Sequence, residues 1–425
     1  MFKEKIKNVW FFHHYATPPD RPGLTRSFDF AKKLNKRGYE CTIFSSSFLH
    51  YANENIITDN SLYKIEIYEG VRFVFINTSS YKSNGIKRIK NFGDYYFNIF
   101  KVTSKLINEI GNPDTIIASS AHPLALLAGQ KISKKYKVPC ICEVRDLWPE
   151  TFVAYKLLSR KNLIMIILYR GEKWLYERAD KMIFTMEGGS DYIKEQGWDK
   201  ESGGTIDIRK VFHLNNGVDI EKFNDNLEKY TLEDQDLNNK STFKVIYTGS
   251  IRMVNNVKSI IESAEYLQKK YSQEIMFLIY GQGEDKAYLE EYCEKHNILN
   301  VKFKGYVEKK YVPYILSQAN LNVLHFTKNS VSKYGASLNK MFEYFASGKP
   351  TISDCEFGYD LIKRFECGIT IDGASSKELA NGIESFYEMP KNLYEEYCEN
   401  SLTAAQNYNF SKLTDQLIEI IEYKN

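Results

Sequence analysis

The sequence predicts an α/β protein built from two doubly wound, Rossmann-like domains. Short apolar strands alternate with helical patterns through most of the 425 residues, and this alternation is typical of a parallel sheet covered by helices. A polar, charge-rich segment at 221–241 interrupts the alternation once, after which it restarts. The length also suits two or three domains of ordinary size, each able to bury a core.

The N-terminal domain is predicted at residues 1–219. Its first strand lies at 9–12 and is followed by a helix at 27–37, which Gly38 ends before a second strand at 41–44. Later strands are predicted at 71–76, 115–118, 139–144, 182–185 and 209–214.

The C-terminal domain is predicted at residues 220–404. It begins with 221–241, which has few strand-forming residues and which we interpret as a link. Strands are predicted at 243–247, 275–280, 301–303, 321–325 and 351–353, and helices at 257–271, 285–296, 310–317 and 340–346. Helical spacing at 409–421 predicts a last helix within the terminal segment 405–425. Ligands of such sheets bind at the carboxyl ends of the strands, so we expect a cleft between two facing sheets.

Charge is distributed unevenly along the chain. Residues 1–219 hold 33 Lys and Arg against 24 Asp and Glu, a net charge of +9, whereas residues 220–425 hold 24 against 30, a net charge of −6. The stretch 81–105 interleaves six cations with aromatic residues, which suits a helix on an anionic membrane surface. The alternative is a helix whose aromatic side chains pack in the core. No nucleic-acid motif accompanies the stretch, so we expect no nucleic-acid partner.

The cysteines and the N-terminal sequence indicate the cellular compartment of the protein. Seven scattered cysteines without a C-x-x-C pair are typical of buried free thiols in a reducing cytoplasm. The N-terminus lacks the apolar stretch of a signal peptide. The longest apolar run, at 163–168, is far shorter than the roughly 20 residues that span a bilayer. We expect a cytoplasmic protein, peripheral on the inner face of the plasma membrane.

The most informative segment is 333–350, KYGASLNKMFEYFASGKP. It places Glu343 in a short apolar helix, where a carboxylate is costly to bury without hydrogen-bond donors. Vicinal ribose hydroxyls are suitable donors. Phosphates suit Lys340 and the turn amides before it, which belong to Ser337, Leu338 and Asn339. The alternative is an amphipathic surface helix with Glu343 in water.

Another candidate lies where the strand at 243–247 ends. Gly249 and Ser250 form a turn before a helix, and such a turn aims free amides and the positive helix end at an anion. Arg252 and Lys258 add two cations. The alternative is a capped helix with two solvated bases.

The next two strands of this domain also end in glycine turns. Gly281 and Gly283 allow close approach of the backbone, either to a nucleotide or within a plain turn. Tyr306 follows Gly305 after the next strand, which is a weaker signal.

The N-terminal domain carries a polar string after a strand, EVRDLWPE at 143–150. We expect Asp146 to face the cleft, with Arg145 beside it. The alternative is an ion pair of Arg145 with Asp146 or Glu150 that only shapes the loop.

Histidines follow two other strands of this domain. In the loop that runs to Gly23, His13 and His14 are adjacent, and we expect one to face the cleft and the other to be packed. His122 is a further candidate at a strand end. No additional ligands stand at metal-binding spacing, so we expect no metal site.

The strings at 145–150 and 337–350 resemble those of the retaining glycosyltransferases of family four. They are most similar to the branch that transfers amino-deoxy sugars in bacterial surface polysaccharides, and the resemblance covers nearly the whole chain. It implies the GT-B fold, in which the last helix crosses back to the N-terminal domain. It also implies a donor site on the C-terminal domain and an acceptor site on the N-terminal domain.

The resemblance further implies roles for individual residues. Arg252 and Lys258 would hold the donor diphosphate and stabilise the leaving group, and the turn at Tyr306 would meet the nucleobase. Asp146 stands where many members have a histidine near the reacting carbon, so its charge would stabilise an oxocarbenium-like transition state. Gly23 is what remains of a glycine-rich loop. Gly335 replaces a glutamate that contacts the donor sugar in many members, so that contact cannot be carried over.

The implied reaction moves a sugar, with retention, from a nucleoside-diphosphate sugar to a saccharide acceptor, which we expect to be lipid-linked, in capsule or O-antigen assembly. No cofactor or metal is needed if the cations hold the diphosphate. A non-hydrolysing nucleotide-sugar epimerase is one alternative, but no matching acid–base motif is visible. A catalytically inactive nucleotide-sugar-binding subunit is the other, and only Gly335 favours it.

Overall fold

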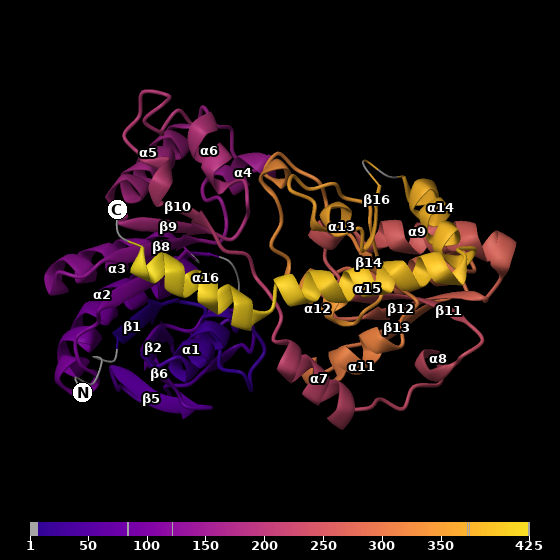
Figure 1. Ribbon diagram of the computed structural model, residues 1–425, viewed down its shortest axis with the longest axis horizontal. Coiled ribbons are helices and arrows are strands. Elements are labelled where there is room, and N and C mark those ends of the chain that lie inside the picture. The colour runs from indigo at the N-terminus through magenta and orange to yellow at the C-terminus, as the bar shows by residue number, and fades with distance from the viewer. Residues whose placement is uncertain (1–6, 83–84, 121, 372, 374, 424–425) are drawn as a thin grey trace. The chain divides into compact units, whose positions relative to one another are not determined.

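Two parallel β-sheets form the cores of two units. The computed structural model describes residues 7–82, 85–120, 122–371, 373 and 375–423 (Figure 1). Unit 1 comprises Met1–Asn215 together with Leu413–Asn425, and unit 2 comprises Asn216–Lys412. The sequence placed the first division after residue 219 and the second after residue 404.

Unit 1 contains an eight-stranded sheet in the order β10-β9-β8-β7-β1-β2-β6-β5. Its strands are β1 (Lys7–Phe12), β2 (Tyr39–Ser46), β5 (Tyr63–Tyr68), β6 (Val71–Ile76), β7 (Thr115–Ser119), β8 (Cys140–Val144), β9 (Lys181–Phe184) and β10 (Val211–His213). Neighbouring strands pair in parallel, except that β5 pairs antiparallel with β6 at one edge. β3 (Phe48–Leu49) and β4 (Glu54–Asn55) form a separate ladder.

The helices of unit 1 connect these strands. They are α1 (Arg26–Lys36), α2 (Ile86–Ile110), α3 (Pro123–Tyr136), α4 (Glu150–Ala154), α5 (Leu163–Arg178) and α6 (Gly189–Glu195). Strands β7 and β8 are buried along their whole length, as expected for parallel strands that are covered on both faces. This burial explains the apolar runs in the sequence from which β7 and β8 were predicted.

Unit 2 contains a six-stranded, all-parallel sheet in the order β13-β12-β11-β14-β15-β16. Its strands are β11 (Phe243–Thr248), β12 (Ile275–Tyr280), β13 (Val301–Gly305), β14 (Leu321–Leu324), β15 (Thr351–Ser353) and β16 (Gly368–Thr370). Its helices are α7 (Ile220–Lys229), α8 (Gln235–Asn238), α9 (Val257–Tyr271), α10 (Lys286–Lys295), α11 (Val312–Ser317), α12 (Asn339–Ala346), α13 (Leu361–Arg364), α14 (Ser376–Tyr387) and α15 (Lys391–Asn407).

The interpretation of 221–241 as a link was wrong. The segment belongs to unit 2 and contains the helices α7 and α8. Asp219 caps α7 by accepting a hydrogen bond from the Lys222 amide, and Asp234 caps α8. One of the residues that made the segment polar, Asp234, is therefore a helix cap.

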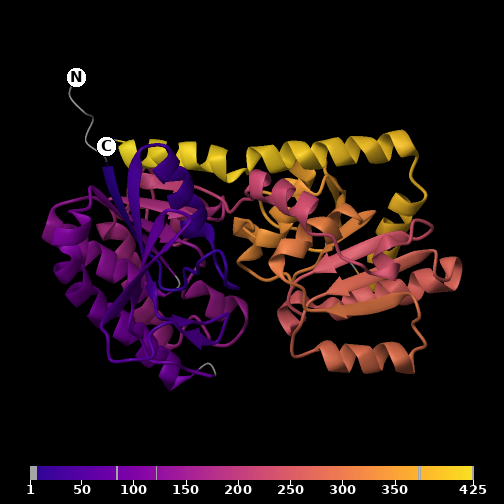
Figure 2. The ribbon, with the colours of Figure 1, turned by 90° about the horizontal axis from the view of Figure 1, so that it is seen from below.

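The last helix, α16 (Phe410–Glu422), ends in unit 1. It is the yellow end of the chain in Figure 2. The buried Lys181 Nζ donates to the carbonyl oxygens of Ile420 (2.7 Å) and Ile421 (2.9 Å), so a strand residue satisfies acceptors that a helix C-terminus leaves open. Arg37 also pairs with Asp415. These contacts fix the helix on the unit 1 sheet.

Each sheet has a point where the strand order reverses. In unit 1 this point lies between β1 and β7, and in unit 2 between β11 and β14. Doubly wound sheets bind ligands outside the carboxyl ends of the strands at such a point. The loops that leave these four strands are therefore where each unit is expected to hold a ligand.

Candidate functional site

The glycine turns of unit 2 lie against one another at the carboxyl edge of its sheet. The Gly249 amide donates to the Tyr280 carbonyl (3.0 Å), and the Gly281 amide to the Gly305 carbonyl (2.8 Å). A Cβ atom on Gly281 would lie 1.8 Å from the Gly249 oxygen, and one on Gly283 would lie 1.9 Å from the Ile251 oxygen. Close packing of the loops therefore requires glycine at positions 281 and 283. This requirement explains both glycines without a ligand.

Lys340 lies over the first of these turns. Its Nζ donates to the Tyr247 hydroxyl (3.1 Å), lies 4.3 Å from the centre of that ring, and is 2.8 Å from where a Cβ on Gly249 would be. Although the Lys340 side chain as a whole is half-buried, its ammonium group is enclosed. This burial lowers the pKa of Lys340 to about 7. The ammonium forms no ion pair within the described residues, so an anion there would be stabilised.

The start of α12 adds open hydrogen-bond donors beside this ammonium. No side chain caps the helix, so its first amides lack a side-chain acceptor, and the Met341 amide donates instead to the Leu338 carbonyl at 3.1 Å. Ser337 is held in place, because its Oγ and carbonyl accept hydrogen bonds from Asn216 at 3.0 and 2.8 Å. Leu338 occupies the N-cap position and Asn339 is exposed. An uncapped helix start beside an enclosed lysine ammonium is suited to phosphate.

Glu343 lies one turn after Lys340 on α12. Its side chain is half-buried, and Oε1 pairs with Lys309 Nζ at 3.2 Å. It is therefore neither in open water nor a fully buried carboxylate. Gly335 has a φ of +100°, a backbone conformation that glutamate rarely adopts, so the missing acidic residue is consistent with the local chain path.

The two cations predicted to hold a diphosphate are placed differently. Arg252 is exposed and forms no ion pair within the described chain. Lys258 pairs instead with Glu262 (3.5 Å) and lies over the Tyr292 ring, and Glu262 is the largest cause of its raised pKa. The structure thus brings Lys340, rather than Lys258, to Gly249.

Two features of the glycine turns were missed by sequence reasoning or left weak. Asn255 Nδ2 donates to both Ser250 oxygens at 2.7 Å, which holds the turn, and an asparagine in a loop gives no sequence signal for that role. Tyr306 is 62 % exposed after Gly305, so its ring is accessible to a flat ligand.

A histidine–aspartate pair at the same edge was also missed. His325 follows β14, Asp354 follows β15, and both are buried. His325 Nδ1 is hydrogen-bonded to Asp354 Oδ2, while His325 Nε2 and Asp354 Oδ1 have no hydrogen-bond partner in the described chain. Polar residues directly after two apolar strands were the available signal.

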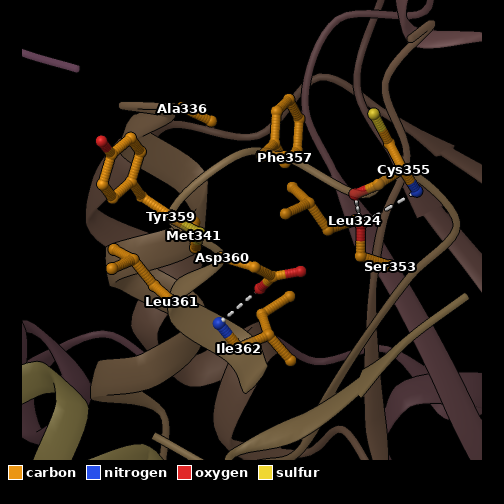
Figure 3. A pocket seen from close by; sticks show the side chains of 10 residues that line it. All are labelled: Leu324, Ala336, Met341, Ser353, Cys355, Phe357, Tyr359, Asp360, Leu361 and Ile362. Carbon is orange, nitrogen blue, oxygen red and sulfur yellow. Dashed lines mark hydrogen bonds between the residues drawn. The ribbon is translucent and has the colours of Figure 1, made fainter. Parts of the chain in front are cut away.

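A small hollow in unit 2 is lined in part by residues of α12 and α13 (Figure 3). It is lined by Leu324, Ala336, Met341, Ser353, Cys355, Phe357, Tyr359, Asp360, Leu361 and Ile362. Its volume is about 10 Å³, which is room for about one water molecule. It is thus too small to hold a nucleotide or a sugar.

In unit 1, His13 and Arg145 meet at the carboxyl edge of the sheet. Arg145 Nη1 is 3.0 Å from His13 Nε2, and His13 Nδ1 is 2.8 Å from Ser27 Oγ. Burial, together with the charge of Arg145, holds the pKa of His13 well below its usual value. Arg145 forms no ion pair with Asp146 or Glu150 among the described residues, so the alternative in which such a pair shapes the loop has no support.

The expectation that one of the adjacent histidines faces a cleft was wrong, because both rings are buried. Asn91 Nδ2 donates to the Ser79 carbonyl, so its Oδ1 must accept from His14 Nε2, at 2.8 Å. His14 Nδ1 is therefore an acceptor, and it has no partner in the described chain. His122, 4.7 Å away between ring centres, is buried as well, and its pKa is lowered to about 3.

Asp146 is exposed at the end of β8. Partial desolvation raises the pKa of Asp146, and the charge of Arg145 opposes that rise. Gly23 has a φ of +149°, and a Cβ there would lie 2.1 Å from Thr17 Oγ1, so the glycine closes its own loop. The structure brings Asp146 near Arg145 but places Gly23 in a structural role.

Buried charges elsewhere in unit 1 support this edge. Arg26 Nε pairs with Glu143 Oε1 at 2.8 Å, and Ser119 donates to the same carboxylate. Arg26 also donates to the Leu214 carbonyl. Within the described residues no group of three or more side chains could hold a metal ion, and no helix is long and apolar enough to cross a membrane.

Comparisons with known proteins agree with this architecture. The family model described as Glycosyltransferase Family 4 matches residues 25–222, and that described as Glycosyl transferases group 1 matches residues 229–403. An uncharacterized glycosyltransferase of Methanocaldococcus jannaschii, MJ1069, is 22 % identical over an alignment of 424 positions that covers 98 % of each chain.

Solved structures share the fold across both units. The sucrose-phosphate synthase of Thermosynechococcus elongatus matches with a TM-score of 0.72 and 14 % identity, over 97 % of this chain and 98 % of that one. Anabaena HepE, in complex with UDP and glucose, matches with a TM-score of 0.66 and 15 % identity, over 99 % and 100 % of the two chains. Because the two family models between them span most of both units, the chain belongs to the glycosyltransferases of the group 1 and family 4 type, with the GT-B fold.

Proposed function

We propose that this glycosyltransferase moves a sugar, with retention, from a nucleoside-diphosphate sugar to a saccharide acceptor in the assembly of a bacterial surface polysaccharide. The donor binds unit 2 and the acceptor binds unit 1. The sugar transfer takes place in the cytoplasm, and the acceptor is lipid-linked. Cationic side chains hold the diphosphate, so neither a metal nor a cofactor takes part.

One observation carries the donor part of this proposal. Lys340, in the uncapped first turn of α12, brings its enclosed ammonium to Gly249, where the strand order of unit 2 reverses. That combination supplies a positive charge and free amides to a diphosphate. Glu343, one turn further along, would accept hydrogen bonds from ribose. HepE, which shares the fold, was solved with UDP and with UDP-glucose.

The acceptor part rests on unit 1 and on the resemblance of 145–150 to the family. Asp146 is exposed at the end of β8, beside Arg145. An ionised Asp146 would stabilise positive charge that develops on the sugar carbon in the transition state. The retention of configuration and the polysaccharide substrate rest on the resemblance.

Calorimetry with nucleoside diphosphates tests the donor site. Lys340→Ala should weaken binding by about ten- to a hundred-fold, the usual worth of a charge-assisted phosphate bond, and Glu343→Gln should weaken it less. Lys295→Ala is the matched control, because Lys295 is exposed in the last turn of α10, and helices that connect parallel strands end at the opposite edge of the sheet. Equal affinity in the parent protein and in Lys340→Ala would reject the assignment.

Product analysis tests the reaction. A transferase releases nucleoside diphosphate only when an acceptor is present, an epimerase returns an altered nucleotide sugar, and an inactive subunit does neither. The anomeric configuration of the product decides retention. Full activity in the presence of a chelator is expected, because lysine and arginine replace the metal; loss of activity that Mg²⁺ or Mn²⁺ restores would overturn that part.

A further inference from the structure

The outward face of α5 is unusually apolar. Leu163, Ile164 and Ile167 are 71, 59 and 58 % exposed, and Trp174 further along the same helix is 41 % exposed. Leu157, just before the helix, is 67 % exposed. Single exposed apolar residues are ordinary on protein surfaces, but a contiguous group marks an interaction site. We call these five side chains the α5 patch.

The α5 patch is not a misplaced core face. The opposite face of α5 carries Met165, Tyr169, Glu172 and Tyr176, which are buried. Tyr169 donates to Glu150 of α4 (2.6 Å), and Tyr192 of α6 donates to Glu172 (2.7 Å), and α4 and α6 lie near α5 in Figure 1. These bonds set the rotation of α5, so the patch is presented outward by the folded unit.

Cations surround the α5 patch. The side chains of Lys156, Lys161 and Arg170 are exposed and form no ion pair or hydrogen bond within the described chain. Arg178 lies 4.1 Å from the Trp174 ring. The one acidic side chain of α5 that is not buried, Glu177, pairs with Lys173 and Arg178. The patch and its rim are therefore apolar and strongly positive.

We propose that the α5 patch docks unit 1 on an anionic lipid surface. Apolar side chains that enter the headgroup region, ringed by lysine and arginine that meet lipid phosphates, are the two features that bind such a surface. A second copy of this chain fits less well, because a two-fold interface would bring the same cations together. This inference stands on unit 1 alone and does not depend on the donor site.

The docking surface differs from the one that the sequence indicated. In α2, Tyr95 and Ile99 are fully buried, and Phe92, Tyr96 and Phe100 are partly buried. Of the aromatic residues in 81–105, Phe97 is the one with a large exposed fraction, 66 %. Most of the aromatic signal in 81–105 therefore belongs to the interior of unit 1.

Co-sedimentation with vesicles tests the proposal. The purified protein should bind phosphatidylcholine vesicles that contain phosphatidylglycerol at least ten-fold more tightly than pure phosphatidylcholine vesicles, and high salt should release it. Ile164→Glu with Ile167→Glu should lower binding at least ten-fold, and so should Lys161→Glu with Arg170→Glu. Because all four side chains are exposed, melting temperatures should stay close to that of the parent.

Matched variants on another exposed surface distinguish a specific role of the α5 patch in vesicle binding from a general effect of added negative charge. Ile86→Glu with Ile89→Glu, on α2, makes the same change at residues that are 86 and 66 % exposed, and should leave binding nearly unchanged. Nucleoside-diphosphate affinity should be the same in every variant, which separates failure here from failure of the donor site. The proposal is overturned if the parent does not bind anionic vesicles, if α5 and α2 variants lose binding equally, or if the parent is a dimer that the α5 variants convert to a monomer.

Discussion

At the scale of single residues, the environment of Lys340 decides how donor binding depends on pH. Its ammonium is enclosed by Gly249 and Tyr247, and burial lowers its pKa to about 7, well below the value of roughly 10.4 in an unfolded chain. Above pH 7 the lysine is therefore mainly neutral in the free protein. A bound diphosphate would favour the charged form.

We expect nucleoside-diphosphate binding to take up about one proton at pH 8.5, and affinity to fall as the pH rises from 7 to 9. Calorimetry in two buffers of different ionisation enthalpy measures the uptake directly. Lys340→Met should bind weakly with no uptake. Binding at pH 8.5 without proton uptake by the parent would show that Lys340 does not meet the phosphates.

The second prediction at this scale concerns the role of Asp146 in turnover. Since Arg145 is engaged by His13 rather than paired with Asp146, the exposed carboxylate is free to act on a substrate. Asp146→Asn keeps the shape and removes the charge, so turnover should fall about 100-fold or more while nucleotide affinity and melting temperature stay nearly unchanged. Arg145→Ala is the companion variant, and it should lose stability because His13 loses its partner. Parental turnover in Asp146→Asn would show that the residue is not catalytic.

Single residues also show where sequence reasoning stops. Lys340 and Glu343 could be selected because a helix start and an apolar run are local patterns. The choice between Lys258 and Lys340 at Gly249 could not be made, because it depends on a side chain that arrives from a helix 82 residues later. His14, in the loop after β1, is hydrogen-bonded to Asn91 of helix α2, and the His325–Asp354 pair depends on the adjacency of β14 and β15.

At the scale of elements, the buried parallel strands and helix α9 were the most predictable, whereas the long helices α5 and α15 were not predicted. The bounds of β6, β12, β15 and α9 agree with the sequence prediction, because continuous apolar runs and helical spacing are strong local signals. The edge strand β5 was missed. It is only partly buried and pairs along one side, so its apolar content is diluted by exposed polar residues. The helices α7 and α8 were missed for the related reason that they are short and mostly exposed.

Helix α5 carries a prediction of stability. Glu172 accepts hydrogen bonds from Tyr176 and Tyr192 and is buried, and burial raises its pKa to about 8. The unfolded chain would ionise it near pH 4.3, so between roughly pH 4.3 and 8 the folded state holds a proton that the unfolded state has lost. Stability from this group therefore falls as the pH rises through that window.

Glu172→Gln removes this dependence, because the amide stays neutral. The melting temperature of Glu172→Gln minus that of the parent should therefore be larger at pH 8.5 than at pH 5. Glu177→Gln, on the exposed side of the same helix, is the control and should show little change. An equal difference between Glu172→Gln and the parent at both pH values would mean that Glu172 is already ionised in the folded protein.

At the scale of the whole molecule, the chain returns to unit 1 through α16 after completing unit 2. No local sequence feature of α16 determines that it packs on unit 1. What fixes it is Lys181, a buried lysine at the start of β9 that donates to the last carbonyls of the helix. The amphipathic spacing at 409–421 predicted a helix, whereas the lysine that holds its end lies more than 200 residues away in the sequence.

Lys181→Met tests this attachment. The methionine fills the space but leaves the Ile420 and Ile421 carbonyls without their donor, which should cost about 1–3 kcal/mol and speed hydrogen exchange in 413–423. Lys7→Met is the matched control on the same helix, because Lys7 pairs with Glu422 at the exposed surface, where ion pairs contribute roughly 0–1 kcal/mol. Nucleoside-diphosphate affinity should be unchanged in both variants, since the residues of the proposed donor site all lie in unit 2. Because the acceptor is proposed to bind unit 1, turnover should fall in Lys181→Met as α16 detaches. If exchange in 413–423 rises equally in both variants, the attachment of α16 depends on its packing rather than on Lys181.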